Sequence, residues 1–292
     1  MHFSKTTFFL LYSLICLIWG STWLVIHLGT AAALPPFAAA SLRFMVASGL
    51  LWIYIFWKKI SLPKSPAKWF AVIAVGLLSN AISFGIVYWT AAYIPSGLGA
   101  VIFGTMPLWT AALGHYTLVD DKLTKAKVAG IFVGLIGIVT IFFPQFQQLK
   151  PESLWAMVLL LGSPIVSGAS AVITKRGTKE VPAVSINAIT TAVGATVLGA
   201  IAFMVEPVGS IQLTFAQLWP VLYLAILGTI VTFGIYFMLI KVTSAVTMSY
   251  VSIITPAIAV LLGWLILGEK LDGYEIGGSA LVLVGTAISL RM

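Results

Sequence analysis

The sequence predicts an all-α membrane protein with ten transmembrane helices, arranged as two inverted five-helix repeats with both termini in the cytoplasm. Three observations carry this prediction: an apolar composition, an uneven placement of basic residues and an internal repeat. The chain has 292 residues, of which 60% are hydrophobic and only 8% charged, whereas soluble domains are about 45–50% apolar and about 25% charged. Its mean hydropathy is +1.09. This composition suits the bilayer as solvent.

Ten apolar runs follow one another along the chain, each about 20 residues long and able to cross about 30 Å as a helix. Because the runs are continuous rather than alternating, they predict helices and not the strands of a barrel. Prolines mark the breaks, as at Pro35, Pro63 and Pro182. The runs are 7–28, 36–57, 68–91, 95–118, 125–144, 152–174, 183–205, 215–240, 245–267 and 273–291.

The first run begins just after Lys5, and TAAA at 30–33 resembles a signal-peptidase site. A signal peptide has a shorter apolar core, of about 7–15 residues. The first run also matches the sixth, through Gly20 and Gly168, in the repeat described below. We therefore expect a retained first helix.

The basic residues are unevenly placed. The net charge of +8 would suit a nucleic-acid partner. However, when alternate loops are assigned to opposite sides of the membrane, one side receives only Lys150 and Lys270. Arg43 lies inside the second run. The other side holds 13 basic residues: Lys5, Lys58, Lys59, Lys64, Lys68, Lys122, Lys125, Lys127, Lys175, Arg176, Lys179, Lys241 and Arg291. This split follows the positive-inside rule. The basic side is predicted to be cytoplasmic, and no nucleic acid is expected as a partner.

The chain looks like two copies of one unit. The turns DKL at 121–123 and EKL at 269–271 lie 148 residues apart (269 − 121). The same offset relates the pairs Gly130 and Gly278, Leu135 and Leu283, Gly137 and Gly285, Tyr88 and Tyr236, and Ser96 and Ser244. The predicted units are 1–148 and 149–292. Because five is odd, the second unit starts on the opposite side and is inverted, as in many secondary transporters.

Prolines predict bends in the fourth and ninth spans, and glycines predict close packing of the fifth and tenth. Pro107 in the fourth span and Pro256 in the ninth match with one residue of slip and are predicted to kink their helices, as gates or as fixed bends. Small residues such as Gly130 and Gly137 predict close packing for the fifth and tenth spans. These two spans are expected to be structural or to support dimer contacts, so the chain is a monomer or a homodimer.

Several stretches together resemble the drug/metabolite transporter superfamily, and specifically its ten-helix EamA-type members. They are LIWGSTWLVI (17–26), PPFAAASLRFMVA (35–47), YIPSGLGAVIFGTMPLWTAAL (93–113), DKLTKAKVAGIFVGLIGIV (121–139) and TPAIAVLLGWLILGEKL (255–271). The resemblance covers nearly the whole chain. It implies export of amino acids or related small metabolites, and a multi-pass location in a bacterial inner membrane.

Ionisable residues inside spans are functional candidates by default. All eight acidic residues fall at helix ends or in loops. Arg43, about 10 Å along the second span, is a candidate counter-ion for a substrate carboxylate, or it extends outward or bonds carbonyls of a neighbouring helix. His27 and His115 are candidates for proton coupling or packed interfacial residues. Cys16 is alone and the histidines lack metal-ligand spacing, so no metal or other cofactor is expected.

Helical spacing suggests a central cavity. Asn80, Phe84 and Tyr88 are four residues apart and predict one face of the third span, and Trp19, Trp23 and His27 form a similar stripe on the first. The remaining candidates for the cavity wall are Ser163, Ser167, Thr232, Tyr236 and Ser252. Aromatic and hydroxyl side chains suit a small amphipathic solute, and ordinary helix packing is the alternative.

These observations favour a secondary transporter, and an exporter, of small organic metabolites such as amino acids, working by alternating access between the two repeats. A lipid or lipid-precursor translocase is the alternative within the transporter class. A membrane-embedded enzyme is a further alternative, although the sequence contains no HExxH, GxSxG or paired intramembrane aspartates. The expected partners are a small-molecule substrate and the lipid bilayer.

Overall fold

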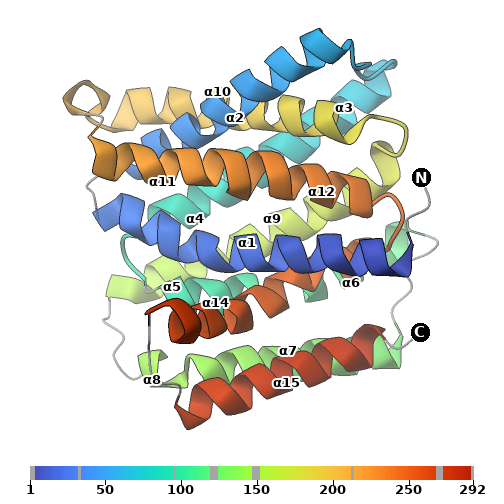
Figure 1. Cartoon of the computed structure of the whole chain (residues 1–292), viewed down its shortest axis with the longest axis vertical. Helices are drawn as coiled ribbons and strands as arrows, with labels where there is room; N and C mark the ends of the chain where they lie inside the picture. Colours follow the sequence, from blue (N-terminus) through green and yellow to red (C-terminus); the bar gives the residue numbers. More distant parts are fainter. Residues whose placement is uncertain are drawn as a thin grey trace.

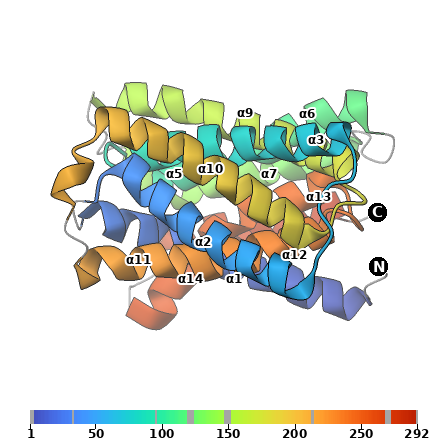
Figure 2. The ribbon, with the colours of Figure 1, turned by 90° about the horizontal axis from the view of Figure 1, so that it is seen from above.

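The computed structural model describes residues 4–31, 34–94, 96–118, 124–146, 152–211, 214–267 and 272–290. In these ranges the chain forms helices joined by short turns, and no strand occurs. Helix α1 (Lys5–Ala31) begins and helix α15 (Gly273–Leu290) ends at the same end of the bundle (Figure 1, Figure 2). This placement is what an even number of crossings produces.

The helices of the first part of the chain begin where local signals predict. Ser65 and Thr124 cap α3 and α7, each accepting a hydrogen bond from a backbone N–H three residues on, and α2 and α3 carry proline in their first turn. The elements after α1 are α2 (Pro36–Lys58), α3 (Pro66–Val75), the π-helix η1 (Gly76–Ser83), α4 (Phe84–Thr90), α5 (Ser96–Phe103), α6 (Met106–Thr117), α7 (Lys125–Ile141) and α8 (Phe143–Phe146).

The second part repeats this order closely. Helices α7 and α15 begin 148 residues apart (273 − 125), and the two π-helices end at Ser83 and Val231, again 148 apart (231 − 83). The elements before α15 are α9 (Glu152–Gly177), α10 (Ala183–Val205), the 3-10 helix η2 (Val208–Ser210), α11 (Phe215–Ala225), the π-helix η3 (Ile226–Val231), α12 (Thr232–Leu239), α13 (Ala245–Ser249) and α14 (Val251–Leu267). The division of the chain at residue 148 stays a prediction.

Eight helical segments in the described part of the chain are long and apolar enough to cross a membrane. They include four composite segments, such as Pro66–Thr90, which joins α3, η1 and α4. Helix α7, with 17 residues, and helix α15, with 18, are outside this set. The all-helical membrane class is thus confirmed, while the count of ten spans and the cytoplasmic side of the termini stay predictions.

The two parts of the chain pack into each other rather than side by side. Helix α2 packs along α10, α6 along α9 and α1 along α14, and Figure 2 shows α2 and α10 crossing the same face of the bundle. The cores therefore mix residues from both parts: one cluster joins Val72 and Val75 of α3 to Ile186 and Ile189 of α10.

Helices α7 and α15 form a pair at one edge of the bundle (Figure 1). Their glycines face each other so closely that a Cβ on Gly137 would lie 2.7 Å from the Gly278 carbonyl oxygen, and a Cβ on Gly285 would lie 2.5 Å from the Gly134 nitrogen. Glycine is required here because backbone meets backbone. The close packing expected from these glycines is what the structure shows.

Polar contacts tie the bundle together at both ends. Glu206, which follows α10, accepts hydrogen bonds from the backbone N–H groups of Phe37 and Ala38, both at 2.8 Å, in the first turn of α2. At the end where α1 begins, Lys175 donates to the carbonyls of Ile240 and Thr243, at 3.1 and 2.7 Å, just after α12. Carboxylate at a helix N-terminus and ammonium at a C-terminus both complement the helix dipole.

Two predicted features lie outside the described residues. The first is the pair of turns at 119–123 and 268–271, which carry the DKL and EKL motifs. The second is the side chain of His27, although the backbone of His27 belongs to α1.

Candidate functional site

A large cavity in the described part of the chain lies between helices of both sequence halves. It holds about 910 Å³ of atom-free space, with its open part included. Its wall takes residues from α1 to α6 and η1 in the first half, and from α9, α12, α13 and α14 in the second half. A site shared in this way changes shape whenever the two halves move relative to each other.

Aromatic rings make up one side of the cavity. Trp19 of α1 packs edge-on against Phe233 and tilts against Tyr236, with ring centroids 5.3 and 5.8 Å apart. Phe84 lies 6.0 Å from Phe233, and Trp23 lies edge-on at 6.1 Å from Phe103. All of these rings line the cavity. They offer apolar faces and edges to a solute.

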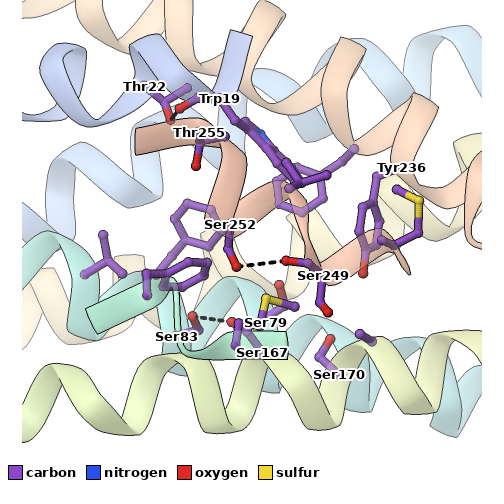
Figure 3. A pocket seen from close by; sticks show the side chains of 18 of the residues that line it. Trp19, Thr22, Ser79, Ser83, Ser167, Ser170, Tyr236, Ser249, Ser252 and Thr255 are labelled. Carbon is purple, nitrogen blue, oxygen red and sulfur yellow. Dashed lines mark hydrogen bonds between the residues drawn. The ribbon is translucent and has the colours of Figure 1, made fainter. Parts of the chain in front are cut away.

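Hydroxyl groups make up another side, as Figure 3 shows. Ser83 bonds Ser167 at 2.7 Å across the η1 and α9 interface, and it also bonds Ser163, behind the wall, at 2.7 Å. Ser252 donates to the Ser249 carbonyl at 2.8 Å. The hydroxyl residues on the wall are Thr22, Ser79, Ser83, Ser167, Ser170, Thr174, Ser249, Ser252 and Thr255. These hydroxyl groups can donate and accept hydrogen bonds without themselves carrying charge.

Arg43 of α2 also lines the cavity and is only 1% exposed. Its Nε donates to Thr229 Oγ1 at 2.8 Å, one terminal nitrogen to the Gly228 carbonyl at 2.9 Å, and the other to the Tyr88 hydroxyl at 3.3 Å. Its guanidinium carbon lies 4.8 Å from the centre of the Phe84 ring. These partners are all neutral.

The π-helix η3 presents the acceptors that hold Arg43. A π-helix has wider turns than an α-helix, so the regular i to i−4 hydrogen bonds are interrupted, and such segments often occur at functional sites. Thr229 Oγ1 bonds the Leu224 carbonyl five residues back at 2.8 Å. The Gly228 carbonyl accepts from Arg43 and also from the Trp19 indole nitrogen at 3.2 Å. One carbonyl thereby connects α1, α2 and η3.

The structure places seven of the eleven non-histidine candidates for substrate or charge interactions on the cavity wall: Trp19, Trp23, Arg43, Phe84, Ser167, Tyr236 and Ser252. The other four, Asn80, Tyr88, Ser163 and Thr232, are buried behind it. Tyr88 lines a second, smaller pocket of about 300 Å³ and bonds Arg43. The binding roles of all these residues stay predictions.

Asn80 lies within η1 and, unlike Phe84, does not line the cavity. It packs against α10, where a Cβ on Gly194 would lie 2.7 Å from the Asn80 Cβ. Asn80 is 1% exposed, and both polar atoms of its amide lack a partner in the described part of the chain. Of the three residues expected on one face, Phe84 lines the cavity, whereas Asn80 and Tyr88 do not.

The predicted kinks at Pro107 and Pro256 differ from each other. Pro256 lies inside α14, as expected. Pro107 lies in the first turn of α6, just after the break between α5 and α6 at Gly104 and Thr105. This break falls within the apolar segment Leu98–Thr117, and the gating or bending roles of both prolines stay predictions. His115 lies near the end of α6, half-buried, with its ring 5.2 Å from that of Tyr116.

Several further wall residues carry a signal in the sequence, namely a recurrence at helical spacing. Ser79 and Ser83 are four residues apart, and Ser249, Ser252 and Thr255 recur every three. Hydroxyl residues at this spacing fall on one side of a helix. Thr229 and the Gly228 carbonyl had no such signal, because backbone acceptors at a π-helix leave no mark in the sequence. In the described part of the chain, no three His, Cys, Asp or Glu side chains are gathered as a metal site requires.

Comparison with protein families identifies the chain. The model of the EamA-like transporter family matches residues 7–143 and, a second time, residues 154–291. The chain belongs to the EamA-like transporter family. The resemblance inferred from the sequence motifs is thus confirmed, and this EamA-type chain is a multi-pass membrane transporter.

Relatives of this EamA-type chain carry transporter names. It is 28% identical to an uncharacterized transporter, YoaV, of Bacillus subtilis (strain 168), over 93% of the chain and 92% of the relative. It is 30% identical to an uncharacterized inner membrane transporter, YedA, of Escherichia coli (strain K12), over 89% and 82%. A solved crystal structure matches with a TM-score of 0.82 at 18% identity, covering 98% of each chain. This last similarity concerns the fold.

Proposed function

We propose that this transporter is a secondary exporter of small organic metabolites such as amino acids, working by alternating access in a bacterial inner membrane. The central cavity supports the proposal, because its wall combines residues of both sequence halves around aromatic rings and hydroxyl groups. Relative movement of the halves would expose such a cavity to one side and then to the other.

In this proposal the eight apolar segments and the pair of α7 and α15 cross the membrane together. The termini then lie on one side, which the basic loops assign to the cytoplasm. The helix starts that recur after 148 residues (273 − 125) support an inverted duplication. The name of the YedA relative supports the inner membrane as the location.

Efflux from liposomes tests the proposal. Purified protein is reconstituted, and efflux of a mixed panel of amino acids and small metabolites is measured by mass spectrometry, with and without a pH gradient. We expect efflux of a subset of the panel, reduced at least about tenfold by Tyr236→Ala, which removes a ring from the cavity wall. Tyr54→Ala is the matched control, because Tyr54 is 43% exposed on α2 and does not line the cavity.

The pattern of efflux distinguishes the alternatives. Dependence on the pH gradient directs attention to His27 and His115 as proton carriers. If folded protein moves no member of the panel, the metabolite exporter is contradicted, and flipping of labelled lipids in the same liposomes then tests the translocase.

A further inference from the structure

The cavity carries an unbalanced positive charge. Arginine stays protonated in proteins, and Arg43 is 1% exposed. None of the described residues that line the cavity is acidic. Within the described ranges, the ion pair that does form joins Lys68 and Glu180, near the ends of α3 and α9. A buried charge without a counter-ion is costly and marks a functional site in a membrane protein.

The guanidinium also retains hydrogen-bonding capacity. Arginine has five N–H donors in a planar fork, and three hydrogen bonds to Thr229, Gly228 and Tyr88 account for three of them. The Phe44 and Phe84 rings, whose centres lie 5.4 and 4.8 Å from the guanidinium carbon, help to hold it in place. Two N–H groups of a fixed, desolvated fork match the two oxygens of a carboxylate.

We infer that the cavity binds a solute with a single carboxylate and an otherwise uncharged, largely apolar body, and that the carboxylate lies at Arg43. The inference rests on the proposed function and narrows its substrate class from small organic metabolites to organic monoacids, in place of the amino acids given there as an example. Zwitterionic amino acids fit less well, because their ammonium group meets no acidic side chain on the described wall and is repelled by Arg43.

The rest of the wall suits the body of such a solute. Trp19, Phe233 and Tyr236 offer ring faces and edges on one side, which accommodate an apolar or aromatic body. Serines such as Ser170 and Ser249 face the same space from α9 and α13 (Figure 3), and their hydroxyls can bond a neutral polar substituent. Charge recognition is thus concentrated at Arg43.

Three probes with one carbon skeleton test the inference: 3-phenylpropanoate, its neutral amide 3-phenylpropanamide, and phenylalanine, the zwitterion. Binding of each to the purified full chain in detergent is measured by calorimetry at fixed ionic strength. A hydrogen-bonded charge pair implies that the carboxylate binds about ten- to a hundredfold more tightly than the amide. We expect phenylalanine to bind more weakly than 3-phenylpropanoate.

Variants assign the preference to one residue. Arg43→Gln is expected to abolish the difference between carboxylate and amide, and Arg43→Lys to keep part of it. Ser41→Ala is the control, because Ser41 is buried on the same helix, bonds the Ala195 carbonyl at 2.9 Å and does not line the cavity. It should bind all three probes as the unmodified protein does.

The unmodified protein decides the inference even if Arg43→Gln does not fold. Equal affinity for carboxylate and amide, tighter binding of phenylalanine, or no binding of any probe overturns it. A carboxylate preference that persists in folded Arg43→Gln overturns the role of Arg43. Because binding is measured apart from flux, these outcomes leave the transporter proposal standing, whereas absent efflux from folded protein contradicts that proposal whatever the probes do.

Discussion

At the scale of single residues, Thr229 holds Arg43 in place. Its hydroxyl donates to the Leu224 carbonyl and accepts from Arg43 Nε, both at 2.8 Å, and it is fully buried. Thr229→Val keeps the shape but leaves the Arg43 Nε–H without an acceptor. We expect a loss of about 1–3 kcal/mol in the free energy of unfolding, measured in mixed micelles by tryptophan fluorescence. Thr229→Ser keeps the hydroxyl and should retain most of this stability, so equal losses in both variants contradict the account.

Glu206 is a second residue whose contribution can be measured. It accepts from two backbone N–H groups in the first turn of α2. Glu206→Gln removes the negative charge and one of the two acceptor oxygens, so we expect a loss of about 1–2 kcal/mol in the free energy of unfolding.

Glu180→Gln is the control for Glu206→Gln. Lys68 holds the pKa of the Glu180 carboxyl below its usual range, but the Glu180 side chain is 76% exposed. Exposed ion pairs contribute little to stability, so the unfolding midpoint should not change measurably. A larger effect at Glu180 than at Glu206 contradicts this assignment.

The sequence predicted the wall of the cavity in part, and the reason lies in particular residues. Trp19 and Phe84 could be predicted because large aromatic side chains at helical spacing stand out, and Tyr236 because it is the counterpart of Tyr88 in the repeat. Arg43 stood out as a charge within an apolar run. Its partners Gly228 and Thr229 could not be predicted, because their role depends on a local change in helix type.

At the scale of elements, α7 and α15 offer a test of packing. Gly137→Ala places a Cβ 2.7 Å from both the Gly278 oxygen and the Val282 nitrogen. Backbone atoms cannot rotate aside, so we expect a loss of about 1–3 kcal/mol in the free energy of unfolding. Gly277→Ala is the control in the same helix pair, because nothing lies within 4 Å of the added Cβ. It should leave the free energy of unfolding unchanged or raise it by at most about 1 kcal/mol.

The same two variants test whether α7 and α15 lie outside the transport path. Neither helix contributes a described residue to the cavity wall. Efflux per folded molecule should therefore be unchanged in Gly137→Ala. A selective loss of efflux with normal stability contradicts a structural role for this pair.

Existence and order of the helices were well predicted, because long apolar runs ended by proline or capped by serine and threonine leave few choices. Helix type was not predicted. The residues of η1, Gly76–Ser83, are compatible with an α-helix, and tertiary packing against α9 and α10 accompanies the wider turn. The break at Gly104 and Thr105 divides the fourth span into α5 and α6 just before Pro107, where the sequence predicted a kink.

At the scale of the whole molecule, alternating access predicts which sites become accessible to water. The chain has one cysteine, Cys16, which is buried, so Cys16→Ala gives a background for single cysteines. We expect Ser249→Cys, on the cavity wall, to react with a membrane-impermeant thiol reagent at a rate that a transported solute changes at least about twofold. Labelling of right-side-out and inside-out vesicles measures this rate from each side.

Ser163→Cys is the matched control, because Ser163 is fully buried and does not line the cavity. It should stay unlabelled from both sides. Equal labelling of the two positions, or labelling of Ser249→Cys that no solute changes, contradicts access through this cavity.

The matched π-helices have a consequence for the history of the chain. A π turn contains one residue more than an α turn, so a single inserted codon is the simplest origin of such a segment. Segments η1 and η3 end at Ser83 and Val231, 148 residues apart (231 − 83), and each is followed at once by an α-helix. If the halves arose by gene duplication, one insertion before that event accounts for both. The widened turn is then older than the two-part transporter, and an ancestral five-helix protein already carried it.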